Sequence, residues 1–156
     1  MNQRPSPQER PNRVPWPPLL TVGLIAIAWV VGRVVPVPLP DGLAVPGWAL
    51  VGAALAADVW AALTFRHHRA NIRPDRAATT LIADGPFAHS RNPIYTANVA
   101  LAAGLGLATG NAWQLAAAAI LFVLLREMAV KREEAHMAAR FGKAWTDYTT
   151  RVRRWV

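Results

Sequence analysis

Residues 93–127 read PIYTANVALAAGLGLATGNAWQLAAAAILFVLLRE and decide the fold, because they hold two apolar runs separated only by Gly110 and Asn111. A helix needs about 20 apolar residues to cross the hydrocarbon core of a bilayer. The two runs, 93–109 and 112–127, come close to that length. Because lipid offers no partner for exposed backbone groups, membrane-spanning segments are expected to be helical. The stretch therefore predicts a tight hairpin of two membrane helices.

Two further apolar segments precede this hairpin, at about residues 16–35 and 44–65, and each is long enough to span a bilayer. The predicted fold class is thus all-α, an integral membrane bundle of about four transmembrane spans followed by C-terminal cytoplasmic or interfacial helices over 128–155. Residues 1–15 are rich in Pro, Arg, Asn and Gln and are expected to form a disordered tail. The rest of the chain, 16–156, is expected to form one membrane domain.

The basic residues predict how this bundle is oriented. The chain has 156 residues, a net charge of +8 and 17 Lys and Arg residues, of which all but Arg33 fall on one side of a four-span arrangement. The positive-inside rule makes that side cytoplasmic, which predicts a multi-pass protein of the cell (inner) membrane with both termini in the cytoplasm. Because topology already explains the basic residues, nucleic acid is not expected as a partner. The absence of cysteine excludes disulfides and Cys-ligated metals.

A dense polar group, HSRNPIY at residues 89–95, stands where the third span begins. Pro93 suits the first position of a helix and Asn92 suits its N-cap. The unpaired amides and positive dipole end of such a helix attract an anionic group, and Arg91 adds a fork of donors. Tyr95 lies on the first turn. An alternative stays open on these residues alone: they could form only a cap, a lipid-phosphate contact and an interfacial anchor.

Two residues near this polar group are further candidate ligand contacts. Gly85 opens a Gly-Pro-Phe turn that could bring backbone close to a ligand, and His89 could line the mouth of a pocket. No metal site is expected, because none of the four histidines lies three or four residues from another.

A second polar group, Glu133 and Glu134, follows the fourth span. Adjacent residues on a helix point about 100° apart, so at most one of the two is expected to face inward. Glu134 shares a stripe with Glu127 and Lys131 that is expected to be solvated, which leaves Glu133 as the inward carboxylate. Arg126 lies seven residues before Glu133, is expected to share its face, and is a weak candidate for positioning an acceptor. No catalytic residue is otherwise assigned.

Both polar groups are predicted to lie at the same membrane face. One offers cationic and amide groups, and the other offers a carboxylate. The combination suits a zwitterion such as an amino-acid moiety, with its carboxylate at Arg91 and its ammonium at Glu133.

Two other stretches favour structural roles. The run GLGLATG, residues 104–110, is similar to a nucleotide-binding loop but lies inside a span, so Gly106 and Gly110 are expected to form a helix-packing face. The C-terminal run KAWTDYTTRVRRWV, residues 143–156, mixes basic and aromatic residues, which favours the headgroup layer of a membrane. An interfacial anchor is at least as well supported there as a role in catalysis.

Two motifs carry a resemblance to known enzymes. The first is Arg-Asn-Pro-Ile-Tyr at 91–95, and the second is Glu-Glu-Ala-His-Met at 133–137, followed by Phe141-Gly142 and Tyr148. With the hairpin between them, they resemble the isoprenylcysteine carboxyl methyltransferase and phospholipid methyltransferase family of integral membrane enzymes, over about residues 79–155. The chain departs from the family pattern at three positions: Asn92 for His, Met137 for Leu and Trp145 for Tyr.

The resemblance implies methyl transfer from S-adenosylmethionine, whose methionine end is a zwitterion. The predicted cofactor contacts are Arg91, Asn92, Pro93, Tyr95, Glu133, Glu134, His89 and Gly85. The expected partners are the lipid bilayer and a lipophilic small molecule or lipidated acceptor. Carboxyl O-methylation of a lipid-like or isoprenyl-linked acceptor is favoured, and phospholipid N-methylation is the alternative. A different class also stays open, a small transporter or accessory membrane protein that uses Asp58, an ionisable residue inside the second span.

Overall fold

The computed structural model describes residues 16–70 and 80–155, and the tail predicted over 1–15 lies outside this part of the chain. The described residues form helices and no strands, which confirms the predicted all-α fold. In chain order the elements are α1 (Trp16–Val34), α2 (Ala44–His67), the 3-10 turn η1 (Gly85–Ala88), α3 (Pro93–Thr109), α4 (Ala112–Leu124), the π-helical segment η2 (Leu125–Val130), α5 (Lys131–Phe141) and α6 (Lys143–Arg151).

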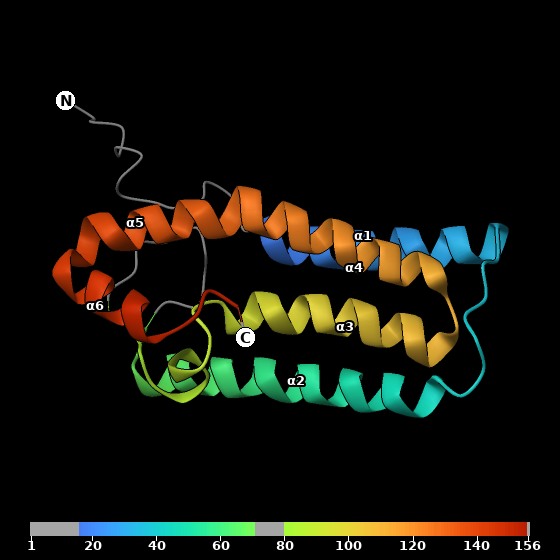
Figure 1. The fold of residues 1–156 in the computed structure, drawn as a ribbon, viewed down its shortest axis with the longest axis horizontal. Coiled ribbons are helices and arrows are strands. Elements are labelled where there is room, and N and C mark those ends of the chain that lie inside the picture. Colours follow the sequence, from blue (N-terminus) through green and yellow to red (C-terminus); the bar gives the residue numbers. More distant parts are fainter. Residues whose placement is uncertain (1–15, 71–79, 156) are drawn as a thin grey trace.

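The four apolar helices α1 to α4 lie side by side in an antiparallel bundle (Figure 1). Helix α3 packs between α2 and α4, and α1 packs against α4. Within the described part of the chain, three helices are long and apolar enough to cross a membrane: Pro17–Val34, Ala44–His67 and the continuous helix Ala112–Phe141 that joins α4, η2 and α5. The fourth, α3, is apolar but has only 17 residues. The predicted four-span bundle therefore consists of three full-length helices and one shorter one.

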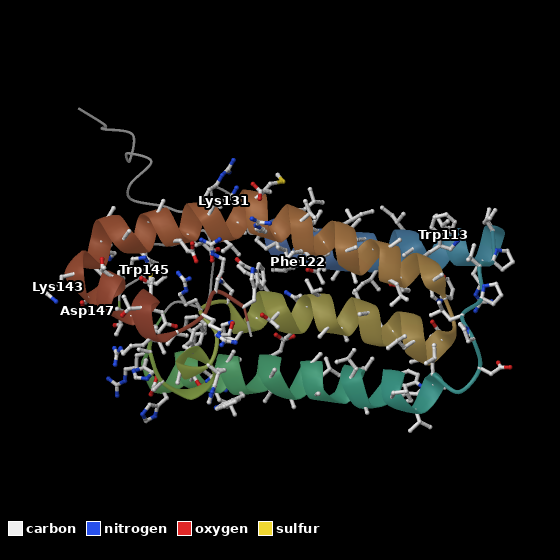
Figure 2. The ribbon with its side chains drawn as sticks, viewed as in Figure 1. Trp113, Phe122, Lys131, Lys143, Trp145 and Asp147 are labelled. Carbon is white, nitrogen blue, oxygen red and sulfur yellow. The ribbon has the colours of Figure 1, made fainter. Side chains whose placement is uncertain are left out.

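The outer faces of this bundle are apolar. Exposed large apolar side chains include Leu19, Val22, Ile27 and Val30 on α1, Val45, Trp48, Val59 and Leu63 on α2, and Ile120 and Val123 on α4. A soluble monomer rarely exposes so much apolar surface, whereas lipid solvates it. Figure 2 shows nitrogen- and oxygen-bearing side chains gathered instead toward the end of the molecule that carries α5 and α6. We call this end of the bundle the polar end.

The hairpin between α3 and α4 forms as predicted. Gly110 caps α3 with a left-handed backbone (φ 65°), a conformation that glycine adopts without a steric penalty. Asn111 caps α4 by accepting a hydrogen bond from the backbone N–H of Trp113 (3.1 Å), and its Nδ2 donates to the carbonyl oxygen of Ala28 in α1 (3.2 Å). One residue pair thus turns the chain and ties the hairpin to α1.

Glycines set how closely the apolar helices approach one another. A Cβ at Gly47 of α2 would collide with the backbone of Ala108 in α3, and a Cβ at Gly104 would lie 3.0 Å from Val51. Gly106 packs against α4 as predicted. The packing role predicted for Gly110 is wrong, because nothing lies within 4 Å of a Cβ at that position and its part is the turn.

The C-terminal helices fold back onto the segment before α3. Gly142 (φ 49°) ends α5 and starts α6. Trp145, Tyr148 and Val152 are buried together and pack against a group of side chains comprising Leu81, Met137 and Phe141. The hydroxyl of Tyr148 donates a hydrogen bond to the carbonyl oxygen of Phe87 (2.7 Å). This packing holds the residues that precede α3 in place at the polar end.

Candidate functional site

The site is built around the first turn of α3. Pro93 is the first helical residue and Asn92 occupies the N-cap position, as predicted. The side chain of Asn92 makes no capping hydrogen bond, so that part of the prediction is wrong. Its Nδ2 donates instead to the carbonyl oxygen of Arg154 (2.9 Å). The amide group is thus engaged by a residue 62 positions further along the chain.

That residue belongs to a short segment, 152–155, which we call the C-terminal clip. Ser90 and Arg153 form an isolated parallel bridge, and the backbone N–H of Arg91 donates to the carbonyl oxygen of Arg153 (2.9 Å). The ring of Trp155 packs 4.8 Å from that of Phe122 in α4. The clip therefore lies on the start of α3, a contact that its composition did not predict.

Glu134 joins the clip to the first motif. Arg154 binds it with two hydrogen bonds, from Nε to Oε1 (3.0 Å) and from Nη2 to Oε2 (2.7 Å), and Nη1 of Arg91 lies 3.1 Å from Oε1. The Glu134 side chain is only 14% exposed, so the prediction that it is solvated is wrong. The hydrogen bond to Glu134 raises the pKa of Arg154 above its usual value.

Arg91 is held from two sides. Its guanidinium carbon lies 6.0 Å from the ring centroid of Trp145, and its side chain is 15% exposed. Its Nε is buried and has no hydrogen-bond partner among the described residues. Buried donors are nearly always paired in folded proteins, so an unpaired one beside a helix start is a candidate ligand contact.

Glu133 lies on the other side of the same helix turn. The hydroxyl of Tyr95 donates a hydrogen bond to Oε1 of Glu133 (2.6 Å), which places Glu133 against α3 as predicted. Tyr95 also belongs to a core cluster completed by Leu121, Leu125, Ala129 and Val130. Both glutamates are therefore engaged by the protein, and the expectation that only one of them faces inward is wrong.

The π-helical segment η2 explains why the sequence misplaced Arg126. A π turn is wider than an α turn, so it rotates all later residues relative to a regular helix. Arg126 is exposed and pairs with Glu127 (3.6 Å), while Glu133 faces α3. The prediction that Arg126 shares the face of Glu133 assumed an uninterrupted α-helix and is wrong.

Gly85 and His89 lie against α2. A Cβ at Gly85 (φ 55°) would come within 2.8 Å of Thr64 Oγ1, so the absent side chain lets this turn touch the helix. His89 is exposed, with its ring 6.2 Å from that of Trp60. The structure thus joins Tyr95 to Glu133 directly, and joins Arg91 and Asn92 to Glu134 directly or through Arg154. It places Gly85 and His89 on a neighbouring surface against α2.

Asp58 lies inside α2, on the stripe that contains the buried residues Ala54 and Ala61. Its Oδ1 is buried and has no hydrogen-bond partner among the described residues. Ionisable groups in membrane helices are costly, which makes Asp58 a candidate functional residue in its own right.

Sequence reasoning missed Arg154 and Trp155. The run RVRRW carries basic and aromatic residues, which suit a binding site. The same composition predicts contact with a membrane surface equally well. Only the chain's return to the start of α3 distinguishes the two roles.

Comparison with known proteins agrees with this geometry. A family model described as phospholipid methyltransferase matches residues 44–144, which is 101 of the 156 residues. The match begins with α2, includes both motifs, and ends before Tyr148 and the C-terminal clip. No curated protein and no solved structure matches the chain. With its two motifs joined at the start of α3 in a bundle of apolar helices, the chain belongs to the phospholipid methyltransferase family, which indicates a membrane methyltransferase.

Proposed function

We propose that the protein transfers a methyl group from S-adenosylmethionine to a lipid-like or isoprenyl-linked acceptor in the membrane. One observation carries the proposal: the two motifs, 38 residues apart, meet through the hydrogen bond between Tyr95 and Glu133. Family membership supports methyl transfer. It also favours methyl transfer over the transporter alternative built on Asp58.

The residues around the start of α3 fit the methionine end of this cofactor. Arg91, Arg154 and Glu134 together carry one net positive charge, and Arg91 keeps a buried Nε without a partner. With the amide end of α3 beside it, Arg91 would hold the cofactor's carboxylate. Glu133, oriented by Tyr95, would hold its ammonium group. Asn92 and Pro93 would contribute by fixing where α3 starts, and Gly85 and His89 by lining the neighbouring surface.

Methyl transfer from S-adenosylmethionine mainly requires the protein to position the methyl group and the acceptor. S-adenosylmethionine supplies, when bound, a methyl group attached to a positively charged sulfur. Arg91 and Glu133 orient that group, and the apolar helices keep water away from the reacting atoms. A carboxylate or thiolate acceptor needs no general base. An amine acceptor must also lose a proton.

Two acceptor classes follow. Carboxyl O-methylation is proposed first, because it needs no base beyond the residues described above. Phospholipid N-methylation is the second candidate, because the matching family is described by that acceptor and because Asp58 offers a buried carboxylate oxygen to a cationic headgroup. Either acceptor would reach the site sideways from lipid, along the exposed apolar faces of α1, α2 and α4.

We also propose that the polar end of the bundle faces the cytoplasm, so that both termini lie there. The positive-inside rule supports this orientation, because among the Lys and Arg residues within 16–70 and 80–155 only Arg33 lies at the opposite end. The cofactor would then enter from the cytoplasm, and the acceptor from the bilayer of the cell membrane.

The deciding experiment is binding of S-adenosylmethionine to the purified protein in lipid nanodiscs, by titration calorimetry. We expect saturable binding to the wild type, and binding weakened at least about tenfold in Arg91→Ala and Glu133→Gln, since each removes a charged hydrogen-bonding partner. A folded wild type that shows no binding would refute the proposed function.

Two matched variants serve as controls. Glu127→Gln removes a carboxylate six residues before Glu133 on the same continuous helix, where the side chain is exposed and bound to Lys131. Arg140→Ala removes an exposed cation from α5. Both are expected to bind as the wild type does, which would assign the losses in Arg91→Ala and Glu133→Gln to their positions rather than to overall charge.

A further inference from the structure

Arg91 has two possible anionic partners in the proposed site. One is Glu134, which contacts it in the structure (3.1 Å), and the other is the carboxylate of the cofactor. A guanidinium fully committed to one carboxylate binds a second one weakly, because the first has already neutralised its charge. The availability of Arg91 therefore depends on what else holds Glu134.

Arg154 holds Glu134 more completely than Arg91 does. It contributes two hydrogen bonds in a side-on pair (3.0 and 2.7 Å), the geometry that suits a guanidinium and a carboxylate best. Arg91 contributes only one close contact, at Oε1, and its buried Nε has no partner among the described residues. Glu134 is thus oriented mainly by Arg154.

The charges of this trio lead to the same conclusion. Two arginines and one glutamate leave one positive charge at the start of α3, in a setting where Arg91 and Glu134 are each about 15% exposed or less. Without Arg154, the remaining pair would be neutral and would offer little attraction to an anion. Screening by solvent is weaker at such partly buried positions than at a free surface.

We propose that Arg154 is a positioning residue for cofactor binding: by holding and neutralising Glu134, it leaves Arg91 free to bind the carboxylate of S-adenosylmethionine. This role rests on the proposed function. It places a functional side chain in the C-terminal clip, beyond residues 44–144 that the family model matches.

Contacts that do not involve the Arg154 side chain also hold the clip on the start of α3. A role of Arg154 in cofactor binding can therefore be distinguished from a role in folding. The carbonyl oxygens of Arg153 and Arg154 accept hydrogen bonds from Arg91 and Asn92, and Trp155 packs against Phe122. None of these contacts uses the guanidinium of Arg154. Replacing that group is therefore expected to leave the clip in place.

The test is a double-mutant cycle on cofactor binding, using the full chain in nanodiscs. We expect Arg154→Gln to weaken binding of S-adenosylmethionine about tenfold. We expect Glu134→Gln to bind at least as tightly as the wild type, and the double variant to recover to within about threefold of it, because Arg91 no longer faces a competing carboxylate. Arg151→Gln, which removes an exposed arginine of α6, is the matched control and is expected to bind normally.

The outcomes separate this inference from the proposed function. If the wild type fails to bind, the proposed function is refuted and the role of Arg154 with it. If the wild type binds but Arg154→Gln binds equally well, or the double variant binds no better than Arg154→Gln, the positioning role is overturned and the proposed function stands. Should Arg154→Gln fail to fold, as judged by thermal unfolding, Glu134→Gln decides alone: undiminished binding supports the role, and a loss overturns it.

Discussion

Single hydrogen bonds at the start of α3 join parts of the chain that are far apart in sequence. Tyr95 and Glu133 meet across α3 and α5, and Asn92 meets the carbonyl of Arg154. A hydrogen bond typically contributes about 0.5 to 1.5 kcal/mol to stability, and leaving a buried partner unpaired costs about 1 to 3 kcal/mol. At this scale a loss of one atom has a measurable effect without a change of fold.

Tyr95→Phe tests this directly. The ring is expected to keep its place in the core cluster beside Leu121 and Leu125, while Glu133 loses the donor that orients it. We expect the dissociation constant for S-adenosylmethionine to rise about tenfold, with the helical circular dichroism spectrum unchanged. An unchanged dissociation constant would show that the hydroxyl does not serve the site.

Tyr148 offers a test by pH. Burial raises the pKa of Tyr148 to about 12, although Arg91 acts in the opposite direction, while an exposed phenol has a pKa of about 10. The unfolded chain therefore releases this proton first, so stability is fully present below about pH 10 and falls as pH rises toward about 12.

We expect the midpoint of thermal unfolding to drop more steeply in that range for the wild type than for Tyr148→Phe, which has no phenol to ionise. The variant should also start lower, by about 1 kcal/mol, because it loses the hydrogen bond to Phe87. Parallel pH profiles for the two proteins would contradict the assignment.

One π-helical segment and a few glycines set the positions of whole helices. The π-helical segment η2 rotates α5 relative to α4, so that Glu133 and Glu134 both reach the start of α3 while Arg126 stays outside. Gly47 of α2 and Gly104 of α3 let those two helices pack at backbone contact. Small residues serve this purpose in membrane bundles, where apolar burial alone does not drive helices together.

Gly47→Ala should separate α2 from α3. The added Cβ would meet the backbone of Ala108, which has no flexible atoms to move aside, so we expect a loss of about 1 to 3 kcal/mol of stability. Gly52→Ala is the matched control on the same helix, because nothing lies within 4 Å of its Cβ. Thermal unfolding in detergent should rank Gly47→Ala clearly below Gly52→Ala, and equal midpoints would argue against close packing at Gly47.

The whole molecule has two chemically different ends. The polar end carries the candidate site, α5 and α6, and the opposite end carries the α3–α4 turn (Figure 1). Arg33, in the last turn of α1, lies near that turn. This asymmetry is what the positive-inside rule uses to orient a membrane protein. It also separates the proposed cofactor site at the polar end from the exposed apolar faces of the helices.

The orientation can be measured because the chain has no cysteine of its own. Asp41→Cys and Lys143→Cys each introduce one thiol at an exposed position, at opposite ends of the bundle. With a membrane-impermeant maleimide on intact cells, we expect labelling of Asp41→Cys at once, and labelling of Lys143→Cys only after permeabilisation. The reverse pattern would place the polar end outside.

The sequence by itself determined the helices and their apolar faces. The lengths of the four apolar runs predicted the helices α1 to α4, and Gly110 with Asn111 predicted the hairpin between α3 and α4. Both predictions succeed because these features depend on residues close together in the chain. The motif residues at 91–95 and 133–137 also pointed to the family. Such local signals are enough to predict the helices of a membrane protein. Lipid offers no hydrogen-bond partners to the backbone, so an apolar segment that enters the bilayer forms a helix.

Only the tertiary structure decided which polar groups meet. Asn92 gave its amide to Arg154 instead of capping α3, and Glu134 faced two arginines instead of water. The π turn, which regular helical periodicity cannot reveal, turned Arg126 away. The physical reason is common to Asn92 and Glu134: a polar side chain takes the partner that the fold brings within hydrogen-bonding distance, and that partner was up to 62 residues away.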